Sequence, residues 1–339
     1  MPHESLDIAL LVHPDDPTPV WDPQQIEARL SHLGHRAVVS DHAPHKTSMI
    51  HALGWAAGRA AADTACTFVL TPEGSVPDDA AAIVGSATAV LVPSRDRADV
   101  INRLGTPHFK ITVLPVAVDC DVFSRLGQAA RRTDRFRVLS RSCGSHGLLH
   151  AVELLSLLPG IELVVLLEQG AQRLPDDVES LARQSGVRSR IAAVRVGDEG
   201  ERAWWLRSGD AVVCLDETDA DGAFVAEAMA CGTPVVATLI DTHRELVVHA
   251  VTGFAVRPGD TLGAARALRE ILSDDFTREA YGMAASDRAL SRLDASHIAA
   301  DLVAAYRRAL SVEVVSPDDE TVDDDRADAD GHADAESAH

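Results

Sequence analysis

The sequence predicts an α/β protein made of two doubly wound, Rossmann-like domains that face one another across a cleft. Its 339 residues are too many for one ordinary domain and suit two domains of common size. Short β-rich runs alternate with amphipathic or alanine-rich stretches along almost the whole chain, which is the pattern of βα units on parallel sheets. A turn-rich passage near residue 120 interrupts this alternation. We therefore expect domains at 1–127 and 128–295, a helix at 296–310 and a tail at 311–339.

In the first domain, strands are expected where short apolar or β-branched runs lie between turn signals. These runs occupy residues 8–12, 36–40, 67–71, 89–92 and 111–114. Two stretches between them have helical character, at 23–33 and 49–62. The linker to the second domain then comprises the turn-rich residues 115–123 and the polar residues 125–135.

The alternation restarts at residue 136 and predicts the second domain. Its strands are expected at 136–140, 162–167, 191–196, 211–215, 235–238 and 253–256. Its helices are expected at 148–158, 176–184, 199–207, 223–230 and 261–272, and the helix at 296–310 follows. In open sheets of this kind, ligands bind beyond the carboxyl ends of the strands.

Acidic residues outnumber lysines and arginines by 52 to 31, which gives the chain a formal net charge of −21. Nucleic acid and anionic lipid both need clustered positive charge, so we expect neither as a partner. Residues 311–339 carry 11 acidic residues, one arginine and no aromatic residue, so we expect a disordered acidic tail. No apolar run approaches the roughly 20 residues of a transmembrane segment, and no signal peptide is recognised, so the expected location is the cytoplasm.

The clearest candidate site is a loop of small residues followed by a helix start, between Asp219 and Glu227. The helix is expected to begin near Gly222, shortly after a strand. A helix N-terminus presents backbone N–H groups and a positive dipole end, which suits a phosphate. Glu227, about one turn into the helix, could accept hydrogen bonds from two ribose hydroxyls. The alternative is an ordinary buried helix whose carboxylate balances the dipole.

Residues 227–237, EAMACGTPVVA, match residue for residue the second half of a signature found in retaining glycosyltransferases of the GT-B architecture, family 4 in particular. The chain resembles this family over about residues 128–290. Members place an acid eight residues before the first Glu of the stretch, usually another Glu, and here that acid is Asp219. The resemblance implies transfer of a sugar from a nucleotide-diphosphate sugar, with retention of configuration. The acceptor stays open as a glycan, a lipid or a small molecule.

The resemblance also implies roles for individual residues of the donor site. Glu227 is expected to hold the ribose and Asp219 a hydroxyl of the sugar. The N–H groups of Gly222, Ala223 and Phe224 are expected to bind the diphosphate. No metal is expected, because an arginine and a helix N-terminus can neutralise the leaving diphosphate.

Two cations hold the diphosphate in the family, an arginine and a lysine five residues later. Arg141 occupies the first position and can grip two phosphate oxygens at once. His146 occupies the second, where a neutral imidazole donates only one hydrogen bond and its charge depends on pH. We expect Arg141 to carry the phosphate role with His146 assisting.

The first domain resembles the family less closely. His51 lies in an Ile-His-Ala that is similar to the family's Val-His-Ala, and Glu73 stands where members have a histidine near the transferred sugar. Both are assigned to the acceptor side. Residues 13–21 replace the family's Gly-Gly loop after the first strand. By analogy with relatives, the helix at 296–310 is expected to cross back to the first domain.

Four features favour a second hypothesis: His146, Glu73, the missing Gly-Gly loop and the acidic tail. It holds that the chain is a GT-B-like binding or partner protein that has lost transfer activity. A third possibility is another nucleotide-sugar enzyme of this architecture, such as an epimerase. Motifs of nicotinamide, P-loop, zinc-protease and α/β-hydrolase sites are absent. The histidine pairs lack neighbouring ligands and the five cysteines lack a CxxC pair, so no metal or other cofactor is expected.

Overall fold

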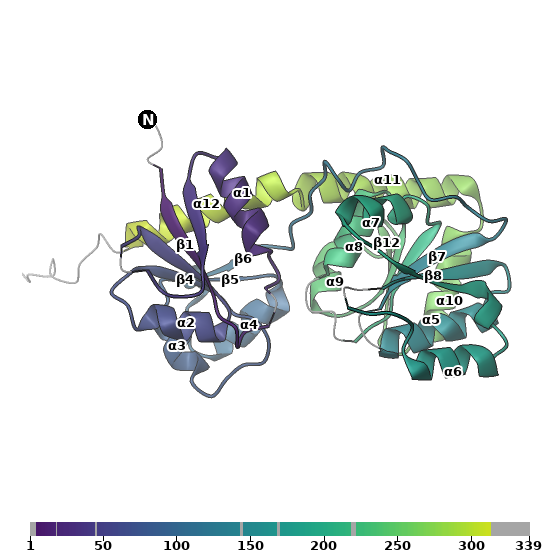
Figure 1. The fold of residues 1–339 in the computed structure, drawn as a ribbon, viewed down its shortest axis with the longest axis horizontal. Coiled ribbons are helices and arrows are strands. Elements are labelled where there is room, and N and C mark those ends of the chain that lie inside the picture. Colours follow the sequence, from purple (N-terminus) through teal and green to yellow (C-terminus); the bar gives the residue numbers. More distant parts are fainter. Residues whose placement is uncertain are drawn as a thin grey trace, which may run out of the picture.

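The computed structural model describes residues 5–17, 19–44, 46–142, 145–167, 170–217 and 222–312, which form two parallel six-stranded sheets. Each sheet has apolar cores on both faces, and helices cover these cores. The two lobes stand side by side (Figure 1). The predicted α/β fold of two doubly wound domains is therefore confirmed.

The first sheet has the strand order β2-β1-β3-β4-β5-β6 and only parallel pairs. Its strands are β1 (Asp7–Val12), β2 (Arg36–Ser40), β3 (Met49–Leu53), β4 (Phe68–Thr71), β5 (Ala89–Val92) and β6 (Ile111–Val113). Its helices are α1 (Pro23–His32), α2 (Trp55–Ala62), α3 (Ala80–Ser86) and α4 (Arg95–Arg103), with a 3₁₀ turn at His108–Lys110.

The helical segment expected at 49–62 is wrong in its first half. Met49–Leu53 is β3, which lies between β1 and β4 and is buried at all five positions. A short run that is apolar throughout has no periodicity to separate a central parallel strand from a helix. The helix begins only at Trp55, after Gly54 turns the chain with φ 121°. This additional strand completes the doubly wound order of the first sheet.

The second sheet has the strand order β12-β11-β10-β7-β8-β9, again with parallel pairs. Its strands are β7 (Phe136–Arg141), β8 (Ile161–Leu167), β9 (Ile191–Arg195), β10 (Ala211–Cys214), β11 (Val235–Thr238) and β12 (Gly253–Val256). Its helices are α5 (Ser145–Leu157), α6 (Asp176–Gln184), α7 (Glu199–Leu206), α8 (Ala223–Ala230), α9 (Asp241–Leu246), α10 (Thr261–Ile271) and α11 (Asp275–Arg292), with a 3₁₀ turn at Arg188–Arg190. The chain then continues into α12 (Ala295–Val312).

The sequence analysis did not predict α3, α4, α9 or α11. The longest of them, α11, buries only Gly282, Ala285 and Ala289, and α4 buries only Ile101. Such helices lack the stripe of large apolar residues by which an amphipathic helix is recognised. The other expected elements lie within a few residues of the observed ones.

The chain passes between the lobes twice, through the linker and through the junction of α11 with α12. The two passages pair: Val118 N–H donates to Leu293 O and Ala295 N–H donates to Val118 O, both at 2.8 Å. Beyond this point α12 packs into the apolar core of the first domain, where Tyr306 is fully buried. In Figure 1, α11 and α12 run as one long yellow-green band across both lobes.

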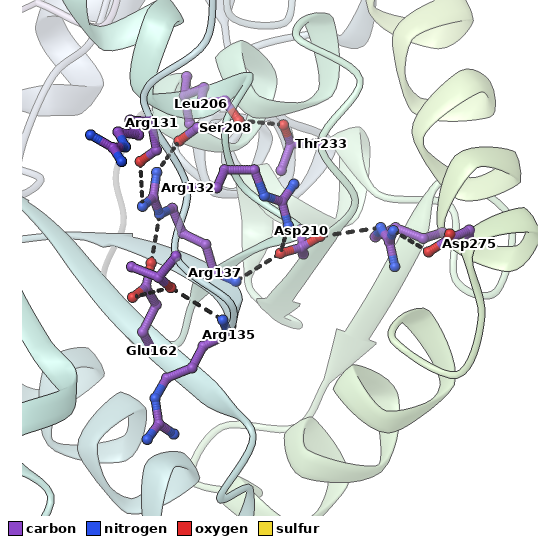
Figure 2. A network of polar contacts seen from close by, with 12 residues as sticks. Arg131, Arg132, Arg135, Arg137, Glu162, Leu206, Ser208, Asp210, Thr233 and Asp275 are labelled. Atoms are coloured by element: carbon purple, nitrogen blue, oxygen red, sulfur yellow. Dashed lines mark hydrogen bonds and ion pairs between the residues drawn. The ribbon is translucent and has the colours of Figure 1, made fainter.

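A polar network fastens the linker to the amino-terminal edge of the second sheet (Figure 2). Its centre is Asp210, whose side chain is fully buried and pairs with Arg132 and with Arg278 Nε at 3.3 Å. Asp210 also accepts a hydrogen bond from the Arg137 N–H at 2.7 Å, and Arg137 Nε donates to Glu162 at 2.8 Å. Structural ion pairs therefore hold the linker on this edge of the sheet, whereas ligands of parallel sheets bind at the opposite, carboxyl edge.

Most of the expected acidic tail, from residue 313 onward, lies outside the described residues. Among the described helices, none has the length and apolar character needed to cross a bilayer.

Candidate functional site

A cavity of about 500 Å³ opens at the carboxyl ends of strands in the second sheet. Arg141 from β7 and Leu166 from β8 line one side, while Arg202 of α7 and Phe224 and Glu227 of α8 line the other. In parallel sheets, the loops after the strands and the starts of the following helices meet at this edge. The sequence motifs at 141 and 222–227 therefore come together in one place.

Arg141 is directed at the first turn of α8. Its guanidinium carbon lies 5.8 Å from the centroid of the Phe224 ring, within the range of a cation–π contact. The side chain is half-buried in the cavity wall. A planar cation held near a helix N-terminus is suited to an anionic group with several oxygens.

The N-cap of α8 is Gly222, in the left-handed conformation with φ 65°. A β-carbon there would lie 2.7 Å from Leu246 Cδ1, so the close approach of α9 also favours glycine. Glycine places no side chain over the first turn, where Ala223 and Phe224 line the cavity. Asp219, predicted at the mouth of the same loop, lies outside the described residues.

Glu227 is buried one turn into α8 and its carboxylate is already engaged. Arg202 Nε donates to Oε2 at 2.7 Å and Arg202 Nη2 donates to Oε1 at 2.9 Å. Burial raises the pKa of Glu227, and the charges of Arg202 and Arg141 act in the opposite direction. Each carboxylate oxygen has a second lone pair, so the group can accept two further hydrogen bonds.

The sequence analysis missed Arg202. It lies near the start of α7, a helix that follows β9 and whose N-cap is Asp198. Its guanidinium carbon lies 5.3 Å from the centroid of the Phe123 ring in the linker. An arginine just after a strand end, at the edge where ligands bind, was the signal available in the sequence.

His146 is exposed in the first turn of α5 and is not among the described residues that line the cavity. The neighbouring Gly147 N–H donates to Asp216 Oδ1 at 3.0 Å. A carboxylate at this point balances the positive dipole end of α5 and leaves less attraction for another anion. The structure therefore does not place His146 in the cavity lined by Arg141 and Glu227, and the sequence analysis missed Asp216.

A similar contact closes the start of α2 in the first domain. Both carboxylate oxygens of Asp16 accept hydrogen bonds at 2.9 Å, from the N–H groups of Ala56 and Ala57. A β-carbon on Gly54 would lie 2.1 Å from Asp16 Cγ, which explains the glycine there. The loop that replaces the expected Gly-Gly segment thus fills this helix N-terminus with its own anion.

His51 is a core residue and does not contact a cleft. It lies on β3, is fully buried, and hydrogen-bonds with Tyr306 Oη and Thr71 Oγ1, both at 2.8 Å. Burial lowers the pKa of His51 to about 3, so the imidazole is neutral at physiological pH. Its assignment as an acceptor-side contact is corrected on this ground.

Glu73 is also buried and shapes the loop after β1. Its Oε1 accepts a hydrogen bond from the Val20 N–H at 3.0 Å. The carboxylate thus holds the segment that leads into α1. Glu73 is not among the described residues that line either cavity at the cleft.

A second cavity, of about 230 Å³, lies between the domains and shares Glu199, Ala223 and Glu227 with the first. Trp21 of the first domain and Leu302 of α12 are among its other lining residues. Gln25 Nε2 of α1 donates to Glu199 Oε1 at 3.1 Å and so bridges the two domains beside the cavity. The site therefore extends from the second sheet into the interdomain cleft.

Comparison with known proteins agrees with this arrangement. Residues 137–288 match the family model described as Glycosyl transferases group 1. A D-inositol 3-phosphate glycosyltransferase from Xylanimonas cellulosilytica is 31% identical over 246 residues, 65% of this chain and 58% of that protein. A phosphatidyl-myo-inositol mannosyltransferase from Mycobacterium leprae is 35% identical over 133 residues, 38% of this chain and 35% of that protein. The chain spans between about half and three fifths of the length of the D-inositol 3-phosphate glycosyltransferases to which it is similar.

Two solved structures with the same fold align with this chain over almost their whole length. Sucrose-phosphate synthase from Thermosynechococcus elongatus has a TM-score of 0.75 at 17% identity, over 90% of this chain and 99% of that one. HepE from Anabaena, in complex with UDP and glucose, has a TM-score of 0.72 at 15% identity, over 89% of this chain and 99% of that one. At such identities the likeness establishes the fold. The predicted GT-B arrangement and the family resemblance are confirmed.

Proposed function

Because residues 137–288 match the family model of the group 1 glycosyltransferases, we propose that the protein transfers a sugar from a nucleotide-diphosphate sugar to an acceptor, with retention of configuration. One observation carries the proposal: Arg141, the start of α8 and Glu227 line a single cavity at the carboxyl edge of the second sheet. The names of similar proteins support it. One is a D-inositol 3-phosphate glycosyltransferase, and HepE was solved with UDP and glucose.

In the proposed complex, the diphosphate lies between Arg141 and the N–H groups of Gly222, Ala223 and Phe224. Negative charge builds up on the diphosphate as the bond to the sugar breaks. A fixed guanidinium and a helix N-terminus stabilise that charge without having to reorganise during the reaction. This pair of groups supports the expectation that transfer needs no metal.

The nucleoside is proposed to occupy the rest of the 500 Å³ cavity, with its ribose hydroxyls on Glu227. The motif assigns a hydroxyl of the donor sugar to Asp219. Phosphate binding is proposed to depend on Arg141 and α8 rather than on His146, because His146 is outside the lining and Asp216 occupies the start of α5.

The acceptor is proposed to approach from the first domain, and its class remains a glycan, a lipid or a small molecule. Retention implies attack of the acceptor hydroxyl from the side on which the diphosphate leaves, so no protein nucleophile is assigned. The Gln25–Glu199 contact supports a closed cleft during transfer. Closure keeps out water, which would otherwise hydrolyse the donor.

Titration calorimetry with UDP, GDP and ADP tests the donor site, with circular dichroism as the check on folding. We expect one of them to bind in the micromolar range, about −8 kcal/mol, without added metal. The matching nucleotide sugar should then be consumed when an acceptor is present. A folded protein that binds none of the three would overturn the proposal and leave the binding-protein hypothesis.

A further inference from the structure

Arg202 joins three parts of the proposed donor site, and no motif assigns it a role. It lies near the start of α7, which packs beside α8 on the side of the second domain that faces the first (Figure 1). Its guanidinium makes two hydrogen bonds to Glu227, at 2.7 and 2.9 Å. Its third contact is with Glu199, 3.7 Å from Nη2 to Oε1. The aromatic ring of Phe123 lies beside the guanidinium carbon at 5.3 Å.

The bidentate pair fixes the plane of the Glu227 carboxylate. A guanidinium fork and a carboxylate are coplanar when both hydrogen bonds form. Each oxygen then uses one lone pair on Arg202 and has another for a ligand in the cavity that both residues line. Two neighbouring oxygens presented in this way match the two adjacent hydroxyls of a ribose.

The charged groups that face Glu227 also decide its protonation. Arg202 and Glu199 act on it from α7, and Arg141 acts from β7. Cys231, at the end of α8, is a neutral thiol because burial raises its pKa to about 12. Burial raises the pKa of Glu227, while Arg202 and Arg141 counteract the effect. Without Arg202, the largest opposing influence is removed, and the carboxyl group would take up a proton at higher pH.

We propose that Arg202 is a positioning residue for donor recognition, which holds the Glu227 carboxylate ionised and oriented so that it accepts both hydroxyls of the nucleoside diol. This inference rests on the proposed function. Arg202 itself need not touch the donor. A residue that only braced α7 against Phe123 and the linker would leave both diol preference and pH dependence unchanged.

The test compares wild type with Arg202→Met and Arg202→Lys by titration calorimetry. The probes are UDP, GDP and ADP, and the 2′,3′-dideoxy form of whichever binds wild type. Arg202→Met should weaken ribonucleotide binding by about tenfold or more, because hydrogen bonds to a charged group are lost. It should change dideoxynucleotide binding by less than about twofold, since that ligand makes no diol contact.

The pH profile separates positioning from a structural role. The terminal phosphate of the nucleotide titrates near pH 6, so each variant is compared with wild type at the same pH between about pH 5.5 and 8. The affinity of Arg202→Met relative to wild type should rise with pH as Glu227 loses its proton. Arg202→Lys retains the charge but not the fork. It should keep the wild-type pH profile and lose part of the preference for the diol.

Arg59→Met is the matched control. Arg59 makes the same bidentate contact, to Asp79 at 2.7 and 2.8 Å, on the surface of the first domain. The Arg59→Met variant should have the nucleotide affinity, diol preference and pH profile of wild type. Circular dichroism confirms that each variant is folded.

The outcomes distinguish the two proposals. If wild type binds no nucleoside diphosphate, the proposed function fails and this inference fails with it. If wild type binds and Arg202→Met shows the same diol preference and the same pH profile as wild type, the positioning role is overturned while the proposed function stands. If Arg202→Met weakens ribonucleotide and dideoxynucleotide equally, Arg202 acts on the fold of α7, and the positioning role is overturned as well.

Discussion

Asp96 of α4 and Arg244 of α9 form an ion pair at 3.6 Å that joins the first domain to the second. Beside it, Glu245 Oε1 lies 3.7 Å from Arg95 Nε and accepts a hydrogen bond from the Arg95 N–H at 3.2 Å. Each helix thus contributes one cation and one anion, and α4 and α9 face one another between the lobes (Figure 1). Exposed pairs are worth at most about 1 kcal/mol each, so the α4–α9 contact holds the two domains together only weakly.

Charge reversal at Arg244 should open the cleft. In Arg244→Glu, two carboxylates face one another at the position of the Asp96 pair, and small-angle scattering of the unliganded protein should give a larger radius of gyration. The double variant Asp96→Arg, Arg244→Glu should restore the wild-type radius because the charges are exchanged. An equal radius in the single variant and wild type would contradict a role for this pair in closure.

Removal of the Arg141 guanidinium should weaken the binding of nucleoside diphosphates selectively. For Arg141→Met we expect a loss of about 10- to 100-fold, because charge-assisted bonds to phosphate are lost. The affinity for the free nucleoside should stay the same. The diphosphate affinity of Arg141→Lys should lie between those of wild type and Arg141→Met, since an ammonium cannot grip two oxygens in one plane. Calorimetry measures all three.

The control for Arg141 is Arg188→Met. Arg188 contacts Glu179 of α6 at 2.9 Å, outside the lining of the donor cavity. The Arg188→Met variant should bind nucleotides with the affinity of wild type. Equal diphosphate affinity in wild type and Arg141→Met would show that the phosphate lies elsewhere.

Gly222→Ala should cost both stability and donor binding. The left-handed backbone costs an alanine about 1–2 kcal/mol, and the new β-carbon would meet the buried Leu246. Gly34→Ala is the matched control, because Gly34 is also left-handed, with φ 82°, and nothing lies within 4 Å of its β-carbon position. Urea unfolding should show a larger loss for Gly222→Ala, and calorimetry should show weaker diphosphate binding only there. Identical losses would mean that the contact with Leu246 relaxes freely.

The buried His51 should make the protein acid-sensitive. Burial lowers its pKa to about 3 in the folded state, against 6.5 for an ordinary histidine. The unfolded chain therefore binds a proton that the folded chain excludes, and stability falls as pH drops below about 6.5 towards 3. His51→Gln, which keeps a hydrogen-bonding side chain without the titration, should flatten that part of the stability curve measured by urea unfolding. A curve as steep as that of wild type would assign the acid sensitivity to other groups, and the exposed His297 provides the control substitution.

Many helices and strands could be predicted from short sequence patterns because they depend on residues that are close together in the chain. Alternating apolar runs located most strands, and the start of α8 followed from Gly222 and the small residues before it. The exceptions have a physical cause. Met49–Leu53 is apolar on both faces and shows no periodicity, and α11 packs through Gly282, Ala285 and Ala289 instead of a stripe of large residues.

The candidate site divides in the same way. Arg141, at the end of β7, and Glu227, in α8, were proposed from the sequence because each belongs to a motif with a fixed spacing. Their partners were not, because a contact such as Arg202–Glu227 or Gly147–Asp216 depends on how separate elements pack. Packing also explains why His51 is not an acceptor contact, because this residue of β3 is buried against β4 and α12.

Sequence patterns were therefore sufficient to predict the family resemblance, the two-domain architecture and the carboxyl edge at which a donor is expected, since these depend on residue types at short spacing. Which helix starts are occupied by the chain's own carboxylates was decided by folding. Asp16 and Asp216 reach the N-termini of α2 and α5 from distant loops, and the electrostatics of a helix end depend on whichever charge the folded chain places there.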